Sequence, residues 1–237
     1  MLNHATLKPF NAPHDSIRDA VEDNTLNIYA QASQKAVEIL ITEEIGEDWM
    51  GGGVKANDVR KLLKDNPGKP VDLIINSPGG LVYDGLQIYN ALISHDAEIT
   101  ATIEGLAYSA ASFVAMAADK IRMFEASDIG VHRAWGVAIG NKAVMADVGE
   151  WLAKTDNHLI DIYQSRTGQP RATVEGWLDG AVDGTLFSAK EAVEVGLADE
   201  VIPLKAKYGD SQEKQAAKKQ FARRAAAKNK LLKAKLK

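Results

Sequence analysis

The chain has 237 residues, 46% hydrophobic and 25% charged, which is the composition of an ordinary globular protein with one large domain or two small ones. It contains no cysteine, which excludes disulfides, thiolate metal sites and a cysteine nucleophile. Because no apolar run is long enough for a membrane span and no secretory signal opens the sequence, we expect a cytoplasmic protein without a membrane partner.

Charge is distributed unevenly. The net charge of −4 combines a balance of +10 over residues 203–237 with a balance of −14 over the rest of the chain. A basic run rich in alanine and lysine is most often a solvated helix or a disordered arm, and its alternative role is a tether to an acidic partner or nucleic acid. Tyr208 and Phe221 are its only aromatic residues, which argues against base stacking, so nucleic acid is not an expected partner.

Three parts are expected along the chain: a loosely ordered arm at residues 1–24, a folded domain at 25–203 and a basic tail at 204–237. Within the domain, short apolar or alternating runs predict strands, and apolar residues at steps of three or four predict helices. Their alternation is typical of an α/β protein with a largely parallel sheet. The predicted strands lie at 26–29, 36–41, 71–75, 99–103, 120–124 and 129–132, and the predicted helices at 57–63 (with Asn57 as N-cap), 83–94 and 109–118.

One long helix is predicted at residues 141–167, ended by the Gly-Gln-Pro sequence at 168–170. Its apolar residues form a single stripe, for which packing in the core is the favoured interpretation. Its length also suits a helix that projects to pack against another subunit. A capping box at 188–191 then opens a short helix to 195, and a last strand closes the domain. The stripe consists of Val144, Val148, Trp151, Thr155, Leu159 and Ile162.

Ser109 is the first residue with candidate chemistry. It stands where a strand turns into a helix of small residues, so that its hydroxyl is pushed out of the sheet and unpaired backbone N–H groups lie beside it. The surrounding Gly-x-x-x-Ser pattern resembles, without matching, the nucleophile elbow Gly-x-Ser-x-Gly. Taken alone, a serine at this place is more often an N-cap than a nucleophile.

Two further features could assist a serine nucleophile. The Asn-Ser-Pro-Gly-Gly sequence at 76–80 follows an apolar strand, and its glycines allow the backbone to approach a ligand closely or to serve as a plain turn. His132 ends an apolar strand, where a general base is held rigidly and still reaches a cleft. The other histidines are His4 and His14 in the arm, His95 in a turn and His158 off the apolar stripe of the long helix. No histidine or carboxylate pair has metal-ligand spacing, so neither a metal nor another cofactor is expected.

These motifs occur together in an order that resembles the Clp protease proteolytic subunit family, and more closely its phage relatives that act as head-maturation proteases. The resemblance covers about residues 25–202 and implies a spiral of β-β-α units, shared with the crotonase enzymes, with a long projecting handle helix. The motifs are Asn-Ser-Pro-Gly-Gly at 76–80, Gly-Leu-Ala-Tyr-Ser-Ala-Ala-Ser at 105–112, Ile-Gly-Val-His at 129–132, and Phe-Ser-Ala-Lys-Glu-Ala-Val-Glu-Val-Gly-Leu-Ala-Asp at 187–199.

The resemblance implies a serine endopeptidase with Ser109 as nucleophile and His132 as base. It places the oxyanion hole at the backbone N–H groups of Gly80 and Ala110. The triad acid is where this sequence departs from the family, because the matching position holds Gly184. A shift of one residue in a loop gives Asp183 as the expected acid, and Asp179 is the alternative.

The resemblance also implies partners: a polypeptide substrate such as a capsid or scaffold protein, further copies of the chain in a homo-oligomeric ring, and a separate ATPase unfoldase. A phage-encoded protein would work in the host cytoplasm or the procapsid. Two alternatives from other classes remain at this point. One is a crotonase-type enzyme acting on acyl-thioesters, since fold alone does not decide chemistry. The other is a non-catalytic assembly or scaffold protein.

Overall fold

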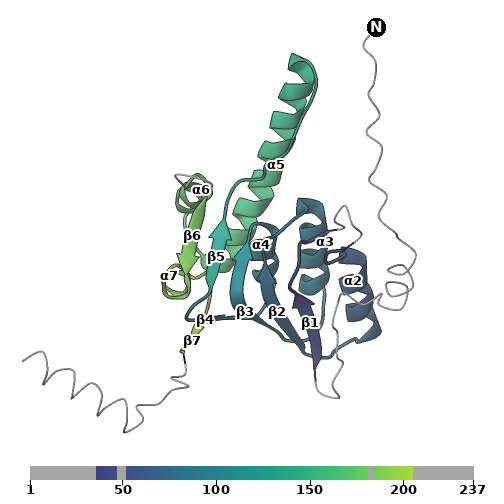
Figure 1. Cartoon of the computed structure of the whole chain (residues 1–237), viewed down its shortest axis with the longest axis vertical. Coiled ribbons are helices and arrows are strands. Elements are labelled where there is room, and N and C mark those ends of the chain that lie inside the picture. Colours follow the sequence, from purple (N-terminus) through teal and green to yellow (C-terminus); the bar gives the residue numbers. More distant parts are fainter. Residues whose placement is uncertain (1–35, 47–51, 181–183, 205–237) are drawn as a thin grey trace, which may run out of the picture. The chain divides into compact units, whose positions relative to one another are not determined.

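A mostly parallel β-sheet is the centre of the computed structural model, which describes residues 36–46, 52–180 and 184–204 (Figure 1). The third strand is the longest, and it pairs with one neighbour at its start and with another at its end. This mostly parallel sheet, with helices between its strands, confirms the predicted α/β class. In order across the sheet the parallel strands are β1 (Val37–Ile41), β2 (Val71–Ser77), β3 (Ile99–Tyr108), β4 (Lys120–Phe124) and β7 (Glu200–Ile202); β5 (Asp128–Val131) pairs in parallel with the end of β3, and β6 (Thr185–Ser188) pairs antiparallel with β5.

Helices alternate with these strands along the chain. None of those within the described ranges is long and apolar enough to span a lipid bilayer. The helix bounds are α2 (Ala56–Asp65), α3 (Val82–Ile93), α4 (Ala110–Ala115), α5 (Lys142–Thr167), α6 (Arg171–Leu178) and α7 (Ala189–Val195).

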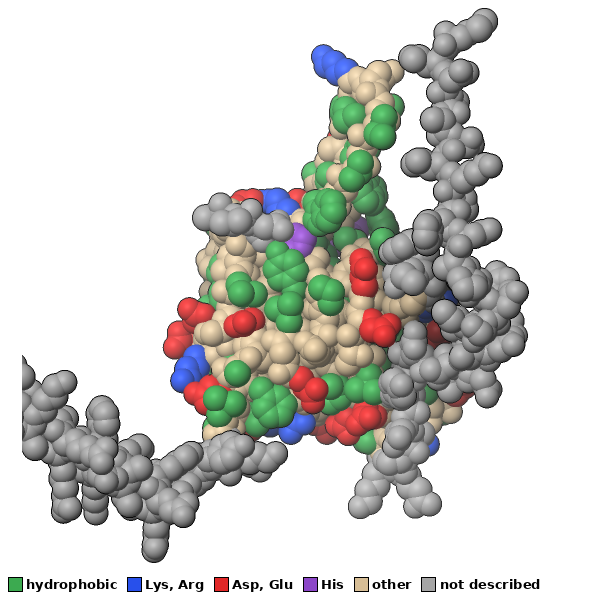
Figure 2. Space-filling model, in the orientation of Figure 1, with side chains coloured by type: hydrophobic (Ala, Val, Ile, Leu, Met, Phe, Trp, Pro, Cys, Tyr) green, Lys and Arg blue, Asp and Glu red, His purple; other side chains and the backbone are tan. Residues whose placement is uncertain are grey.

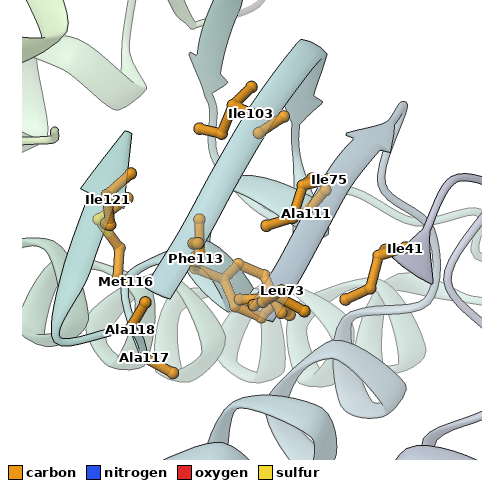
Figure 3. Close-up of a cluster of buried hydrophobic side chains, with 14 of the residues drawn as sticks. Ile41, Leu73, Ile75, Ile103, Ala111, Phe113, Met116, Ala117, Ala118 and Ile121 are labelled. Atoms are coloured by element: carbon orange, nitrogen blue, oxygen red, sulfur yellow. The ribbon is translucent and has the colours of Figure 1, made fainter. Parts of the chain in front are cut away.

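The hydrophobic core forms between one face of the sheet and the helices. Alternate residues of β1 and β2 point into it, as period-two side chains must on a strand. Figure 3 shows how Phe113 of α4 lies beside Leu73 of β2, with Ile103 and Ile121 on the neighbouring strands. These four side chains are at most 1% exposed, so the short α4 is fixed firmly against the sheet.

The long helix α5 begins and ends as predicted. The Asn141 side chain accepts hydrogen bonds from two backbone N–H groups of the first turn, and Gly168 ends the helix with a φ of 68°. The predicted buried stripe is wrong for its first half, because Val144 and Trp151 are 40% and 41% exposed whereas Leu159 is buried. This half projects from the sheet and carries hydrophobic side chains along its length (Figures 1 and 2).

Some local predictions differ from the structure. The N-cap of helix α2 lies two residues earlier than expected, at Lys55 and not at Asn57. The strand predicted at 99–103 extends to Tyr108, and α6 was not predicted. The capping box on α7 is confirmed by the reciprocal hydrogen bonds of Ser188 and Glu191. The arm at 1–24, the strand at 26–29 and residues 205–237 of the tail lie outside the described residues.

Candidate active site

Three loops meet at one edge of the sheet. Strand β3 lies between β2 and the parallel strand β5, so the carboxyl ends of all three strands face the same side. This is the edge at which α/β sheets place their ligands. The loop after β2 carries Gly79 and Gly80, the loop after β3 begins with Ser109, and the loop after β5 begins with His132.

Ser109 has an unusual backbone conformation. With φ 55° and ψ −124°, it is the only described residue other than glycine with a positive φ. Its N–H donates to the carbonyl oxygen of Gly130 across the β3–β5 pair, at 3.0 Å. The side chain makes no capping hydrogen bond to α4, so the N-cap interpretation is wrong for this hydroxyl. Strained backbone of this kind persists where the surrounding structure holds it, and it clusters at functional sites.

The glycines after β2 let the neighbouring loop approach Ser109 closely. A Cβ on Gly79, whose φ is 96°, would lie 2.6 Å from the Cβ of Ser109. One on Gly80 would lie 2.1 Å from the carbonyl oxygen of Ile45. Side chains are therefore excluded at both positions. The backbone hydrogen bonds formed here within the described residues leave the N–H groups of Gly80 and Ala110 without an acceptor.

His132 is buried to 6% exposure, and its imidazole is held on two sides. The Nδ1 atom lies 2.7 Å from the carbonyl oxygen of Arg133. Because a carbonyl oxygen only accepts, Nδ1 carries a hydrogen, and the lone pair of the neutral ring is then on Nε2. The ring also stacks on Tyr108, with centroids 5.1 Å apart and an interplanar angle of 23°. This tautomer is the one in which Nε2 can accept a proton, as a general base must.

Arg133 ties the segment that carries His132 to two helices. Its guanidinium donates to both carboxylate oxygens of Asp179 at the end of α6, and to Asp156 of α5 at 3.1 Å. The second oxygen of Asp156 accepts from the backbone N–H of Ala134 at 2.8 Å. The hydrogen bonds from Arg133 hold the pKa of the Asp179 carboxyl below its usual range. Both carboxylate oxygens of Asp179 therefore accept hydrogen bonds from Arg133 in this structure.

The expected triad acid, Asp183, lies outside the described residues. Gly184, at the position where the family pattern has its acid, packs directly against the strand end that leads to His132. A Cβ on Gly184 would lie 1.9 Å from the carbonyl oxygen of Val131 and 2.5 Å from the Cβ of His132. A side chain at residue 184 is therefore incompatible with this backbone path.

Ser109, His132 and both glycines border one cavity of about 760 Å³. Part of its wall is aromatic, with rings contributed by β3, α3, α4, α5 and the segment after β5. A larger cavity of about 1110 Å³ lies between α2, α3 and α5 and contains none of these four residues, so we place the candidate chemistry in the smaller one. The aromatic residues bordering the smaller cavity are Tyr83, Tyr108, Phe113, Trp135, Trp151 and Tyr163.

The other described histidines, His95 and His158, do not border this smaller cavity. His95 and His158 border the larger cavity, and His95 Nε2 lies 2.7 Å from the carbonyl oxygen of Lys69. His4 and His14 lie outside the described residues. In the part of the chain that the structure describes, there is also no cluster of three or more histidine, aspartate or glutamate residues that could hold a metal ion.

Comparison with known proteins identifies the family of this chain. The model of the Clp protease family matches residues 21–205. The chain belongs to the Clp protease family. It is 32% identical to the ATP-dependent Clp protease proteolytic subunit 1 of Protochlamydia amoebophila over 197 residues, which cover 80% of this chain and 91% of that protein. The same-named proteins of Chlamydia trachomatis and Chlamydia caviae are 33% and 32% identical, over 58% and 62% of this chain and 72% and 79% of their own lengths.

Several residues around the site in this member of the family were given no role by the sequence analysis, although some of them stand in its motifs. Gly130 leaves room for the ring of Tyr108, since a Cβ there would lie 2.0 Å from the Tyr108 Cδ2 atom. Asp156 was not singled out because it lies beside the predicted apolar stripe, with nothing in the sequence to pair it with Arg133. Tyr108 alone offered a usable signal in the sequence, because it is an aromatic residue inside the motif at 105–112 and directly before Ser109.

Proposed function

We propose that this chain is a serine peptidase that cleaves polypeptides, with Ser109 as nucleophile and His132 as general base. Membership of the Clp protease family supports a peptidase. The observation that carries the serine mechanism is the strained backbone of Ser109, in a cavity shared with a buried histidine whose Nδ1 faces a carbonyl oxygen. An acyl-thioester enzyme of the crotonase type would not need this pair.

In the proposed reaction, the Ser109 Oγ attacks the carbonyl carbon of the scissile peptide bond while His132 Nε2 takes its proton. The negative charge that develops on the substrate oxygen is stabilised by the N–H groups of Gly80 and Ala110. His132 then returns the proton to the leaving amine, and an acyl-enzyme remains on Ser109. Water, activated by the same histidine, hydrolyses this ester and frees the serine.

Asp183 is proposed as the acid that orients His132, with the Arg133 carbonyl oxygen as a second acceptor for Nδ1. Hydrolysis of a fluorogenic peptide by Ser109→Ala, His132→Ala and Asp183→Asn tests this assignment. We expect the first two variants to lose activity to a similar extent, because triad members act as a unit. Asp183→Asn should lose less. Activity of Ser109→Ala close to that of the wild type would remove this serine from the mechanism.

We further propose that the chain works as a homo-oligomeric ring. The segment between β5 and α5 exposes Trp135, Val137 and Ile139 to 72%, 85% and 93%, next to the apolar first half of α5. A contiguous apolar surface of this kind indicates an interface between proteins. Light scattering of the double variant Val137→Ser, Ile139→Ser should show a smaller species than the wild type. The matched control is Leu186→Ser, an exposed apolar residue on β6.

The proposed substrate is a polypeptide chain, and two modes of delivery can be separated experimentally. A Clp-type proteolytic subunit would degrade unfolded chains supplied by a separate ATPase unfoldase, whereas a head-maturation protease would cut folded capsid or scaffold protein at fixed positions. Incubation with a carboxymethylated, unfolded protein and with the same protein in its folded form distinguishes the two. General degradation of the unfolded form alone favours the Clp-type role.

A further inference from the structure

A buried pair of hydroxyl groups connects the long helix α5 to the backbone of the candidate nucleophile. The Ser112 Oγ lies 2.6 Å from the carbonyl oxygen of Ser109 and 2.7 Å from the hydroxyl oxygen of Tyr163. Ser112 has no exposed surface, and Tyr163 is 1% exposed. Neither hydroxyl group takes part in the proposed proton transfers, although Tyr163 borders the cavity and Ser112 contacts the Ser109 backbone.

The direction of these hydrogen bonds follows from the number of hydrogens. The Ser109 carbonyl oxygen can only accept, so the single hydroxyl hydrogen of Ser112 is donated to it. The Ser112 oxygen then accepts the hydrogen of Tyr163. Burial raises the pKa of the Tyr163 hydroxyl, so this group keeps its hydrogen at neutral pH. The Tyr163 hydroxyl therefore donates to the Ser112 oxygen, and the Ser112 hydroxyl donates to the Ser109 carbonyl oxygen.

The Ser109 carbonyl belongs to the same peptide group as the N–H of Ala110. In a planar trans peptide the C=O and N–H bonds point in opposite directions, so a carbonyl fixed toward Ser112 also fixes the direction of the Ala110 N–H. The backbone N–H of Ser112 donates to the same carbonyl at 3.0 Å. The hydroxyl pair therefore adds a side-chain donor to this carbonyl. The ψ of Ser109, −124° at a positive φ, is one that a non-glycine residue rarely adopts.

We propose that Ser112 and Tyr163 are positioning residues for the oxyanion hole, which aim and polarise the Ser109–Ala110 peptide. The inference rests on the proposed function, in which the Ala110 N–H is one of the two oxyanion donors. Hydrogen bonds in a chain polarise one another, so donation to the carbonyl strengthens the N–H of the same peptide. Because the oxyanion exists only in the transition state and the intermediate, the effect falls on kcat and leaves KM unchanged.

The variant Tyr163→Phe tests the proposal, because it removes one hydroxyl group and keeps the buried ring. We expect kcat for a fluorogenic peptide to fall by about three- to tenfold, the size of one indirect hydrogen bond and well below the loss of a direct oxyanion donor. A peptide aldehyde, whose adduct with Ser109 carries the same oxygen, should bind more weakly by a similar factor. KM should stay within about twofold of the wild-type value.

Thr155→Val is the matched control. Thr155 is also on α5 and 2% exposed, but its hydroxyl donates to the Trp151 carbonyl of its own helix at 3.1 Å. It should lower Tm about as much as Tyr163→Phe and leave kcat unchanged. Ser112→Ala provides a second variant at the other end of the hydrogen bond. The double variant Ser112→Ala, Tyr163→Phe should lose no more kcat than the worse single variant, because both act through one carbonyl.

Wild-type kcat and aldehyde affinity in both Tyr163→Phe and Ser112→Ala would overturn the inference and leave the proposed function standing. A loss that falls on KM with kcat unchanged would also overturn it. If the wild-type protein neither hydrolyses peptides nor reacts with the aldehyde at Ser109, the proposed function fails and the inference fails with it.

Discussion

Replacing Gly184 by alanine probes how closely the loop before β6 is packed against His132. The residue has a φ of 84°, which costs an L-residue about 1–2 kcal/mol. Its added Cβ would meet the Val131 carbonyl oxygen at 1.9 Å and the His132 Cβ at 2.5 Å, an overlap that adds about 1–3 kcal/mol when relieved by movement of the backbone. The free energy of unfolding should therefore fall by about 2–5 kcal/mol, or roughly 10 °C in Tm for a chain of this size.

The backbone movement should also displace His132 and slow the reaction of Ser109. Thermal denaturation and the rate of labelling by a fluorophosphonate, measured on the same preparation, give both quantities. The control is Gly176→Ala in the interior of α6, where a Cβ meets nothing within 4 Å and the glycine is exposed. This control should raise stability by about 0.5–1 kcal/mol. An unchanged Tm and labelling rate in Gly184→Ala would refute the described packing around His132.

Three further changes have defined outcomes. Arg133 lowers the pKa of Asp179. Their ion pair therefore stabilises the fold fully above the ordinary carboxyl pKa of about 3.9, and this stabilisation is lost as the pH falls through the lowered pKa. The Tm difference between the wild type and Asp179→Asn should accordingly vanish at acid pH. Ser188→Ala removes the cap of α7 and should cost about 1 kcal/mol, seen as roughly 2–4 °C in Tm. Trp151→Ala removes one wall of the cavity and should raise KM for peptides with large apolar side chains more than for alanine peptides, as measured with matched fluorogenic substrates.

Much of the fold could be predicted because apolar periodicity is a local property. The runs at 71–75 and 120–124 and the stepwise apolar residues of 83–94 reflect burial against the sheet, and each became an element near its predicted bounds. Helix α6 escaped prediction because its buried face consists of a single pair at i and i+4, Val174 and Leu178, with no side-chain cap.

The site was predictable only in part. Ser109 and His132 were chosen as candidates because each stands at the end of a strand and within a motif of the family, and both features are visible in one sequence. Contacts that join distant segments are not visible in this way: Ser112 and Tyr163 are 51 residues apart. The burial of Asp156 likewise depends on Arg133, 23 residues before it. The first half of α5 was assigned to the core because a sequence cannot tell which part of an amphipathic helix projects from its own domain.

The most direct test of the serine mechanism is the position at which a fluorophosphonate attaches to the folded protein. Digestion of the labelled wild type and mass spectrometry of the peptides would identify the residue. We expect a single adduct on Ser109, absent from Ser109→Ala and formed much more slowly in His132→Ala, which retains the hydroxyl but lacks the base. A well-folded wild type that remains unlabelled, or one that is labelled equally fast without His132, would contradict the account.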